Sequence, residues 1–418
     1  MRCNDQRRVV ITGVGPVTPV GVGRKDFWAA IIDGQSGTRA LTDLQFGFPV
    51  ECLKSRVVAS VREELLPPDG ADAPGGRHFR LGELGFKLAL QDAGLEDVRG
   101  CRASVVLGNA VGGTTAMEAS FLQMEEGGRL NPARAPSDLA RQMSFHSMAY
   151  ELAAVCGCEG PVLTVSTGCT AGLDAIATGF ELVRMGTSDI ALTGSSEAPL
   201  TPVVFSAFDV IGALTRRNSD PQHASRPYDR ERDGFVLGEG AAFMVLEERG
   251  HALRRGAHIY AELIGFASLS NSYHMTDLPA DGAALAECIC LALKDARIGA
   301  LDVDHINAHG SSTKQNDLCE TNAIKSALGS RAAQITVNSL KSMVGHALGA
   351  SNAIEMVACA LALDKQQLFP TTNLDCPDEG CDLDYVANHA RRASLRHIVK
   401  LSSGFSGIHS AMVMSAAT

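Results

Sequence analysis

The chain contains an internal sequence repeat, and this repeat constrains its fold more than any other feature. Residues 89–93 read Ala-Leu-Gln-Asp-Ala, and residues 292–296 read Ala-Leu-Lys-Asp-Ala. Each segment precedes a predicted strand, the second of which runs toward His309. Self-similarity of this kind marks a repeated structural unit. We therefore expect two related halves, residues 1–255 and residues 256–418.

A second pair of matching segments supports the internal repeat. Thr164-Val165 leads into the turn Gly168-Cys169-Thr170-Ala171-Gly172, while Thr336-Val337 leads into Gly345-His346-Ala347-Leu348-Gly349. An Ala-rich stretch with helical character follows each turn. Cys169 and His346 thus fall at corresponding strand-to-helix turns of the two halves.

The fold class follows from the alternation of short β-branched runs with Ala- and Leu-rich stretches. This alternation is typical of strands covered by helices. The 42 glycines and the low aromatic content of 5% suit an interior of small and aliphatic side chains packed closely between layers. We expect an α/β protein.

Composition excludes several classes of function. The net charge of −10 argues against general nucleic-acid binding, which requires clustered Lys and Arg. Hydrophobic residues make up 45% of the chain, yet no apolar run approaches a bilayer span, so we expect no membrane insertion. The amino end runs directly into Val9 and Val10 without a signal-peptide apolar region. We therefore expect a cytoplasmic protein.

The 12 cysteines favour neither disulfides nor a metal site. They are scattered along a chain with no secretory signal, which indicates reduced thiols. Cys156/Cys158 and Cys288/Cys290 form C-x-C pairs, but neither has a second pair or His at zinc-binding spacing. We expect no metal and interpret most of these cysteines as core or incidental residues.

Cys169 is the predicted nucleophile. It follows a strand and precedes a helix, so its sulfur is expected at a helix amino terminus, where free N–H groups favour a thiolate and lower the pKa. The same N–H groups can stabilise an oxyanion. The competing interpretation is that a small residue simply packs well between Gly168 and Thr170.

Two histidines are the predicted partners of Cys169. His309 follows one predicted strand and His346 lies in the turn after another, so two neutral imidazoles can donate hydrogen bonds to a thioester carbonyl and stabilise an enolate. Lys341 and Glu320 can form an ion pair that fixes both histidines, and a surface salt bridge is the competing interpretation for that pair.

The turn Ser403-Gly404-Phe405-Ser406-Gly407 offers flexible N–H donors and an aromatic gate, and its alternative reading is a tight turn between two strands. The polar loop of residues 214–239 is expected to be functional because long irregular loops are uncommon in compact enzymes. Met117 and Phe121 can lie near a dimer interface and an acyl tunnel, but we favour helix core for both.

The motifs together resemble those of the β-ketoacyl-ACP synthases, of the thiolase superfamily, from about Arg8 to Met414. The resemblance rests on Val165-Ser-Thr-Gly-Cys-Thr170, Arg226-Pro-Tyr-Asp229, Asp233-Gly-Phe-Val-Leu-Gly-Glu-Gly240, His309-Gly-Ser-Ser-Thr313, Lys341-Ser-Met-Val-Gly-His346 and Gly404-Phe405. Within the family the chain looks closest to the ketosynthase α subunit of type II polyketide synthases, on residues 167–170, 271–276 and 381–386.

The resemblance implies a thiolase fold of five layers, αβαβα, and a decarboxylative Claisen condensation. Cys169 would take an acyl chain from an acyl carrier protein, and His309 and His346 would assist decarboxylation of malonyl carrier protein. The N–H groups of Cys169 and Phe405 match the oxyanion hole. Further matches are Ser311 and Thr313 for the phosphopantetheine arm, with Lys341 and Glu320 as the supporting pair.

The resemblance also implies partners. A carrier protein brings the substrates on its phosphopantetheine, so no cofactor of the chain's own is expected, and the α subunit forms a heterodimer with a homologous chain-length factor, otherwise a homodimer. Because the carrier protein is acidic as a family, Arg216 and Arg217 are candidate docking residues, with solvated surface charge as the alternative. Two positions depart from the family pattern, Ser406 in place of Gly and Ser311 in place of Thr.

Rival assignments stay open at this point. A fatty-acid elongating β-ketoacyl-ACP synthase II or a polyene-forming synthase shares the same motifs. A catalytically silent chain-length subunit is disfavoured by the presence of Cys169 with both histidines. A thiolase-like enzyme acting on coenzyme A uses a second cysteine as its base, which the two-histidine arrangement does not match.

Overall fold

In the part of the chain that the structure describes, the central sheet has eleven strands, ten of them in one continuous order, with β2 paired to β1 beside that order. The computed structural model describes residues 7–41, 49–67 and 76–417. In space the strands follow the order β14-β13-β17-β18-β12-β1-β11-β9-β5-β8. Their bounds are β1 Val9–Thr18, β5 Ala103–Gly108, β8 Val162–Val165, β9 Ile190–Glu197, β11 Gly240–Glu248, β12 Ala261–Ser270, β13 His305–Asn307, β14 Thr336–Asn338, β17 His397–Gly404 and β18 Ile408–Ala416.

The strand order repeats in the two halves of the sheet. Outward from β1 the order is β1, β11, β9, β5, β8, and outward from β12 it is β12, β18, β17, β13, β14. Within each set, the five strands can be numbered from one to five by their order along the chain. With this numbering, both sets have the same spatial order: 1, 5, 4, 2, 3. The two sets meet where β1 pairs antiparallel with β12, at Val9 opposite Leu263. The internal repeat in the sequence therefore corresponds to a duplicated strand topology in the structure.

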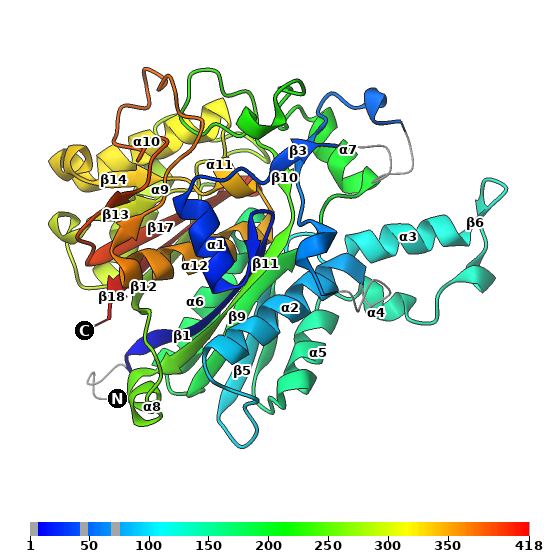
Figure 1. Cartoon of the computed structure of the whole chain (residues 1–418), viewed down its shortest axis with the longest axis horizontal. Helices are drawn as coiled ribbons and strands as arrows, with labels where there is room; N and C mark the ends of the chain where they lie inside the picture. The colour runs from blue at the N-terminus through cyan, green and yellow to red at the C-terminus, as the bar shows by residue number, and fades with distance from the viewer. Residues whose placement is uncertain (1–6, 42–48, 68–75, 418) are drawn as a thin grey trace.

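Helices cover the strands in layers, as Figure 1 shows from the upper left to the lower right. Helices α9 and α10 lie outside the C-terminal strands, α6 and α12 lie in the middle, and α2 and α5 lie outside the N-terminal strands. This arrangement is the five-layered thiolase fold that was expected. The bounds are α2 Gly76–Asp92, α5 Ser147–Cys156, α6 Ala171–Arg184, α9 Ala283–Asp295, α10 Lys314–Leu328 and α12 Gly349–Lys365.

The middle layer is the most deeply buried part of the protein. Residues 349–363 of α12 are all buried, as expected of a helix with strands on both sides. Gly172 allows α6 to approach α12 closely, because a Cβ at this position would lie 2.4 Å from the carbonyl oxygen of Gly349. The amino ends of the two middle helices therefore meet, and these ends carry the turns with Cys169 and His346.

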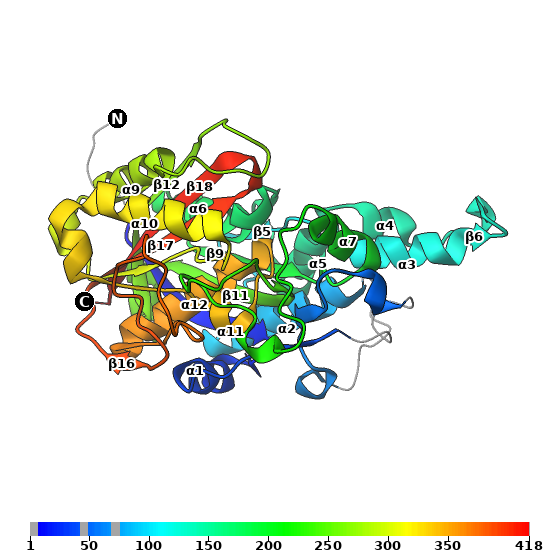
Figure 2. The same ribbon diagram turned by 90° about the horizontal axis from the view of Figure 1, so that it is seen from above.

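An arm projects from the N-terminal half (Figures 1 and 2). It consists of α3 Thr114–Met124, the hairpin of β6 Glu125–Glu126 and β7 Arg129–Leu130, and α4 Leu139–Met143. Met117 is partly buried, but Phe121 is 47% exposed, so the prediction that both belong to a helix core is wrong for Phe121. The helix lacks the second packing layer that a core position needs.

Strand β8 lies at the edge of the sheet, where it pairs with β5. Val162 and Leu163 of β8 are 36% and 41% exposed. Helix α5, which packs against β8, exposes Tyr150 and Val155 as well. An edge strand with apolar side chains is a surface that proteins normally cover.

The remaining elements surround these layers. They are α1 Arg24–Ile32, α7 Pro202–Val210, α8 Arg249–Arg254, α11 Lys341–Val344, β2 Gly21–Val22, β3 Thr38–Ala40, β4 Val57–Ala59, β10 Leu237–Gly238, β15 Gln367–Leu368 and β16 Arg391–Arg392. In the part of the chain that the structure describes, none of the helices combines the length and apolar character needed to cross a membrane.

Candidate active site

One pocket collects most of the predicted site residues. It has a volume of about 540 Å³ including its open mouth. Its walls include six of the predicted residues: Cys169, His309, His346, Ser311, Thr313 and Phe405. Lys341 and Glu320 do not line it but are buried behind its wall. Residues more than 200 positions apart in the sequence thus converge on one cavity.

Cys169 lies on a single 3₁₀ turn, Gly168–Thr170, between β8 and α6. Gly168 has φ +62°, a left-handed conformation that glycine adopts without strain and that gives the chain a sharp turn after the strand. The side chain of Asn352 on α12 donates a hydrogen bond to the carbonyl oxygen of Cys169. The second middle helix therefore helps to hold the predicted nucleophile in place.

The thiol of Cys169 is buried, and this changes its acidity. The predicted lowering of the pKa is wrong, because burial raises the pKa of Cys169 to about 11. The residue as a whole keeps some exposure, but its sulfur is surrounded by protein. The charge of Lys341 lowers this pKa, and so do the backbone N–H groups of Phe405 and of Cys169 itself. The expected N–H groups are therefore present, but desolvation outweighs them.

His309 and His346 face each other across the pocket. Their ring centroids are 5.2 Å apart, with the planes at 81°. Burial, followed by the charge of Lys341, holds the pKa of each well below the usual range of histidine. Both rings are therefore neutral at neutral pH, so each has one N–H donor and one acceptor nitrogen.

The orientation of His346 is set by its neighbours. Its Nδ1 atom lies 2.9 Å from the hydroxyl oxygen of Ser351 in the first turn of α12. Phe235 packs edge-on against the ring, with centroids 5.2 Å apart. A hydroxyl that donates to Nδ1 leaves the proton on Nε2. This contact can therefore select the tautomer with an Nε2–H donor.

Lys341 and Glu320 both hold the backbone of His309, but they do not pair with each other. The predicted direct ion pair between them is wrong. Lys341 Nζ donates to the carbonyl oxygen of His309 at 2.7 Å and pairs with Glu355 at 2.5 Å. Glu320 accepts the N–H groups of His309 at 2.5 Å and Gly310 at 2.8 Å. The two residues act on His309 from opposite sides of its backbone.

Two residues behind the pocket were missed by the sequence reading. Glu355 on α12 and Lys400 on β17 are fully buried and lie 2.7 Å apart, and Glu355 is also the partner of Lys341. Neither lies in a turn or next to a glycine, which are the features that mark the other site residues in the sequence. A charged residue inside an otherwise apolar helix or strand is the sequence signal that could have found them.

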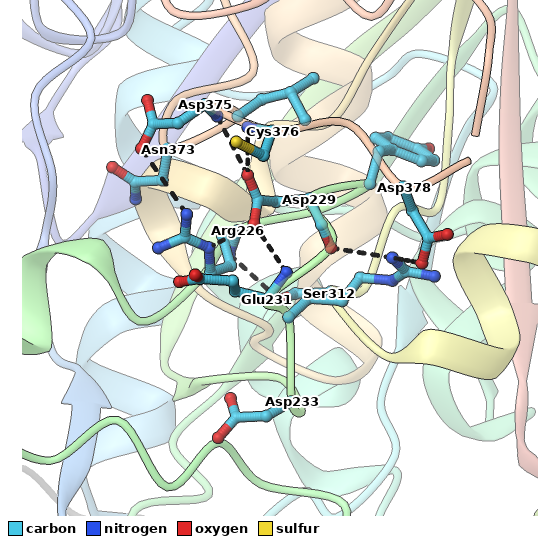
Figure 3. Close-up of polar contacts among 12 residues, drawn as sticks. Arg226, Asp229, Glu231, Asp233, Ser312, Asn373, Asp375, Cys376 and Asp378 are labelled. Atoms are coloured by element: carbon cyan, nitrogen blue, oxygen red, sulfur yellow. Dashed lines mark hydrogen bonds and ion pairs between the residues drawn. The ribbon is translucent and has the colours of Figure 1, made fainter. Parts of the chain in front are cut away.

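A buried polar network fixes the loop that carries Ser311 and Thr313 (Figure 3). Ser312 Oγ accepts the backbone N–H of Arg226 at 3.0 Å, and Arg226 Nε donates to Asp229 at 2.9 Å. The Oγ atoms of Ser311 and Thr313 are 2.9 Å apart, and Thr313 also caps α10. Both hydroxyls are thereby held at the pocket wall.

Phe405 lies in the turn Phe405–Gly407 between β17 and β18. Its ring packs on Phe208 of α7, with centroids 6.1 Å apart. Ser406, which replaces the usual glycine, has φ +67° and donates its N–H to the carbonyl oxygen of Met275 at 2.7 Å. The turn therefore keeps the left-handed geometry that glycine favours, at a cost of about 1 kcal/mol for a residue with a side chain.

Comparisons with known proteins agree with this geometry. Residues 6–63 and 79–252 match the family model "Beta-ketoacyl synthase, N-terminal domain", and residues 260–375 match "Beta-ketoacyl synthase, C-terminal domain". The chain is 43% identical to the tetracenomycin polyketide synthase ketoacyl synthase alpha subunit of Streptomyces glaucescens, over 99% of this chain and 98% of that protein.

Solved structures show the same architecture. One is a type II polyketide synthase acyl-carrier protein in complex with its ketosynthase bound to the hexaketide. The match has a TM-score of 0.93 and 44% sequence identity, and it covers 99% of this chain and 100% of that one. Another is the ishigamide ketosynthase/chain length factor, with a TM-score of 0.88, 30% identity and the same coverage.

The fold and the pocket define an acyl-transferring condensing enzyme. The chain belongs to the β-ketoacyl synthase family. Within the described ranges, no group of three or more His, Cys, Asp or Glu residues is arranged to hold a metal ion.

Proposed function

We propose that this chain is the ketosynthase α subunit of a type II polyketide synthase. It would join a malonyl unit, delivered by an acyl carrier protein, to an acyl chain held on Cys169. The observation that carries this proposal is the pocket shared by Cys169, His309 and His346. The identity of 43% to an α subunit over nearly the whole of both chains supports the subfamily.

The first step is transfer of the acyl chain. The sulfur of Cys169 attacks the thioester of the acyl carrier protein, a new C–S bond forms, and the carrier thiol leaves with a proton. The N–H groups of Cys169 and Phe405 both act on the sulfur, and they would stabilise the oxyanion that forms when the acyl carbon is attached to it. Ser311 and Thr313 at the wall of the pocket would contact the phosphopantetheine arm.

The second step is decarboxylation and condensation. The bond between the malonyl carboxylate and its methylene carbon breaks, carbon dioxide leaves, and the electron pair forms an enolate. Neutral His309 and His346 would each donate a hydrogen bond to the enolate oxygen. The enolate carbon then attacks the Cys169 thioester, a C–C bond forms, and Cys169 leaves as a thiolate that takes up a proton.

The exposed edge of the sheet fits a homologous partner subunit. Leu163 on β8 and Tyr150 on α5 present apolar side chains beside β8, which is the edge strand of the sheet within the described ranges. A chain-length factor of the same fold would cover this surface. The heterodimer is favoured over a homodimer by the resemblance to the polyketide branch and by the ketosynthase/chain length factor neighbour.

Docking of the carrier protein involves a local cationic surface, because the chain carries a net charge of −10. Arg216 is exposed, and its backbone N–H donates to Asp233, which lines an adjoining cavity that shares Thr313 and Phe405 with the active-site pocket. Arg217 is partly neutralised by Glu231 at 2.9 Å. Of the two residues, Arg216 is therefore the better candidate for contact with an acidic carrier.

The test is intact-mass analysis after incubation with malonyl carrier protein, with and without the co-expressed homologous subunit. We expect polyketide-length adducts with the partner present and none with Cys169→Ala. Cys158→Ala, which removes another partly exposed thiol, is the matched control and should behave as wild type. Elongation of ordinary fatty acyl chains by a homodimer would favour the fatty-acid synthase alternative. Full activity of Cys169→Ala would refute the condensing mechanism proposed.

A further inference from the structure

Lys400 is a fully buried lysine that the mechanism above does not use. It lies inside β17, with no exposed surface. A buried ammonium group costs several kcal/mol unless it is paired and hydrogen-bonded. Lys400 Nζ forms an ion pair with Glu355 at 2.7 Å and donates to the carbonyl oxygens of Ala308 at 3.2 Å and Leu401 at 2.5 Å.

The contact with Ala308 reaches the backbone of a predicted catalytic residue. The peptide between Ala308 and His309 has its C=O bound to the Lys400 ammonium and its N–H bound to the Glu320 carboxylate. The peptide dipole is negative at oxygen and positive at the N–H, so a cation and an anion stabilise it from its two ends. The next carbonyl, that of His309, binds Lys341 at 2.7 Å.

Glu355 joins the two lysines. Its Oε1 lies 2.5 Å from Lys341 Nζ, and its Oε2 lies 2.7 Å from Lys400 Nζ. A single carboxylate shared by two ammonium groups leaves the Lys341–Glu355–Lys400 group with a net positive charge, while Glu320 lies on the N–H side of the 308–309 peptide. Fixed positive charge next to a site where an enolate develops lowers the energy of that anion. It also disfavours protonation of the nearby imidazoles.

We propose that Lys400 is a further positioning residue of the condensing site: it fixes the 308–309 peptide, and with Lys341 it supplies positive charge behind the His309–His346 pair. This inference rests on the proposed function for its effect on turnover. The charged and titratable groups that face the pair from the surrounding elements are Lys341, Lys400, Glu355, Glu320, His409 and Cys169. Burial, the charge of Lys341 and then the charge of Lys400 all lower the pKa of His346.

Lys400→Met in the complex with the partner subunit removes the charge and keeps a similar length. We expect kcat to fall about 10- to 100-fold, with KM for malonyl carrier protein within about twofold of wild type, because the loss is in the transition state. We also expect the acidic limb of the kcat profile to move to higher pH, because a charge that disfavours imidazolium is gone. An unchanged kcat, or an unmoved acidic limb, overturns the proposal.

Two further variants separate charge from packing. Lys400→Arg keeps the cation and should recover part of the lost rate. Lys400→Met combined with Glu355→Gln removes one cation and one anion, so its acidic limb should return toward wild type. If the acidic limb of the kcat profile moves as far in the double variant as in Lys400→Met, the proposed electrostatic role of Lys400 is overturned. These variants also carry the test if Lys400→Met alone does not fold.

A measurement without substrate distinguishes this inference from the proposed function. Histidine signals of ¹³C-labelled protein are titrated by NMR, with His309→Gln and His346→Gln used for assignment. Both rings should protonate at higher pH in Lys400→Met than in wild type. Lys365→Met, which removes an exposed lysine next to Asp364, is the control and should not shift them. Absence of turnover in wild type would refute the proposed function, whereas absence of a shift would refute the role of Lys400.

Discussion

The ring of His346 reaches the hydroxyl of Ser351 through its Nδ1 atom, at 2.9 Å, in the first turn of a helix whose interior is wholly buried. When the Ser351 hydroxyl donates to Nδ1, the proton of the neutral ring stays on Nε2. The opposite nitrogen is then the donor available to a substrate oxygen. Under the proposed mechanism, this arrangement would link the hydroxyl of Ser351 to the decarboxylation step.

Ser351→Ala is expected to lower the rate of malonyl decarboxylation. Loss of one buried hydrogen bond is worth about 0.5 to 1.5 kcal/mol, which corresponds to roughly 2- to 13-fold in kcat. KM should change little, because Ser351 does not line the pocket. The assay is release of carbon dioxide from malonyl carrier protein. Ser351→Thr keeps the hydroxyl and serves as the control, and equal rates for the Ala variant and wild type would contradict the tautomer argument.

The raised pKa of Cys169, about 11, predicts how its reactivity depends on pH. Below this pH the thiol is mainly protonated, and the reactive thiolate fraction rises about tenfold per pH unit. Alkylation by iodoacetamide should therefore accelerate steadily from pH 7 to pH 10. The measurement is mass spectrometry of the peptide with Cys169 over time, with Cys169→Ala to identify its signal. A plateau below pH 8 would mean that the N–H groups and Lys341 outweigh burial.

The sequence predicted the pocket residues because each lies in a local pattern. Cys169 and His346 follow strands and precede helices, and the duplicated halves place such turns at equivalent positions. The meeting of these turns depends on a close contact between Gly172 and Gly349, which is tertiary information. The sequence therefore indicated which residues are special, and the structure shows that they share one cavity.

What the sequence did not predict depends on burial and on long-range pairing. Two carboxylates, Glu320 and Glu355, lie in this region together with two lysines. Their spacing along the chain does not reveal that Lys341 pairs with Glu355 rather than Glu320. The acidity of Cys169 was misjudged because a helix amino terminus is visible in a sequence, but the depth of a thiol is not. The arm with Phe121 was also missed, since an amphipathic helix looks the same whether or not a layer covers it.

Glu320→Gln is expected to destabilise both the fold and the site. The carboxylate accepts the N–H groups of His309 and Gly310 and the hydroxyl of Tyr228. An amide would turn an N–H donor toward one of these donors and leave it unsatisfied, at about 1 to 3 kcal/mol. Urea denaturation should show this loss in unfolding free energy, together with reduced kcat.

Tyr228→Phe is the matched control for that variant. It removes only one donor to Glu320 and keeps the ring stacked on Tyr385, with centroids 3.9 Å apart. Its loss of unfolding free energy should be about 1 kcal/mol, with a smaller effect on kcat. If Glu320→Gln were no more destabilising than Tyr228→Phe, the backbone contacts of Glu320 would not contribute as described.

Leu163→Lys is expected to prevent association with the homologous subunit. Leu163 is 41% exposed on the edge strand β8, and a lysine buried in an interface between two strand edges would have to lose its hydration. Light scattering after size exclusion should then give a mass near the 44.0 kDa of one chain instead of that of a dimer. Leu291→Lys places the same charge on α9, where the leucine is 37% exposed, and should leave the dimer intact. A dimer that survives Leu163→Lys would place the partner on another surface.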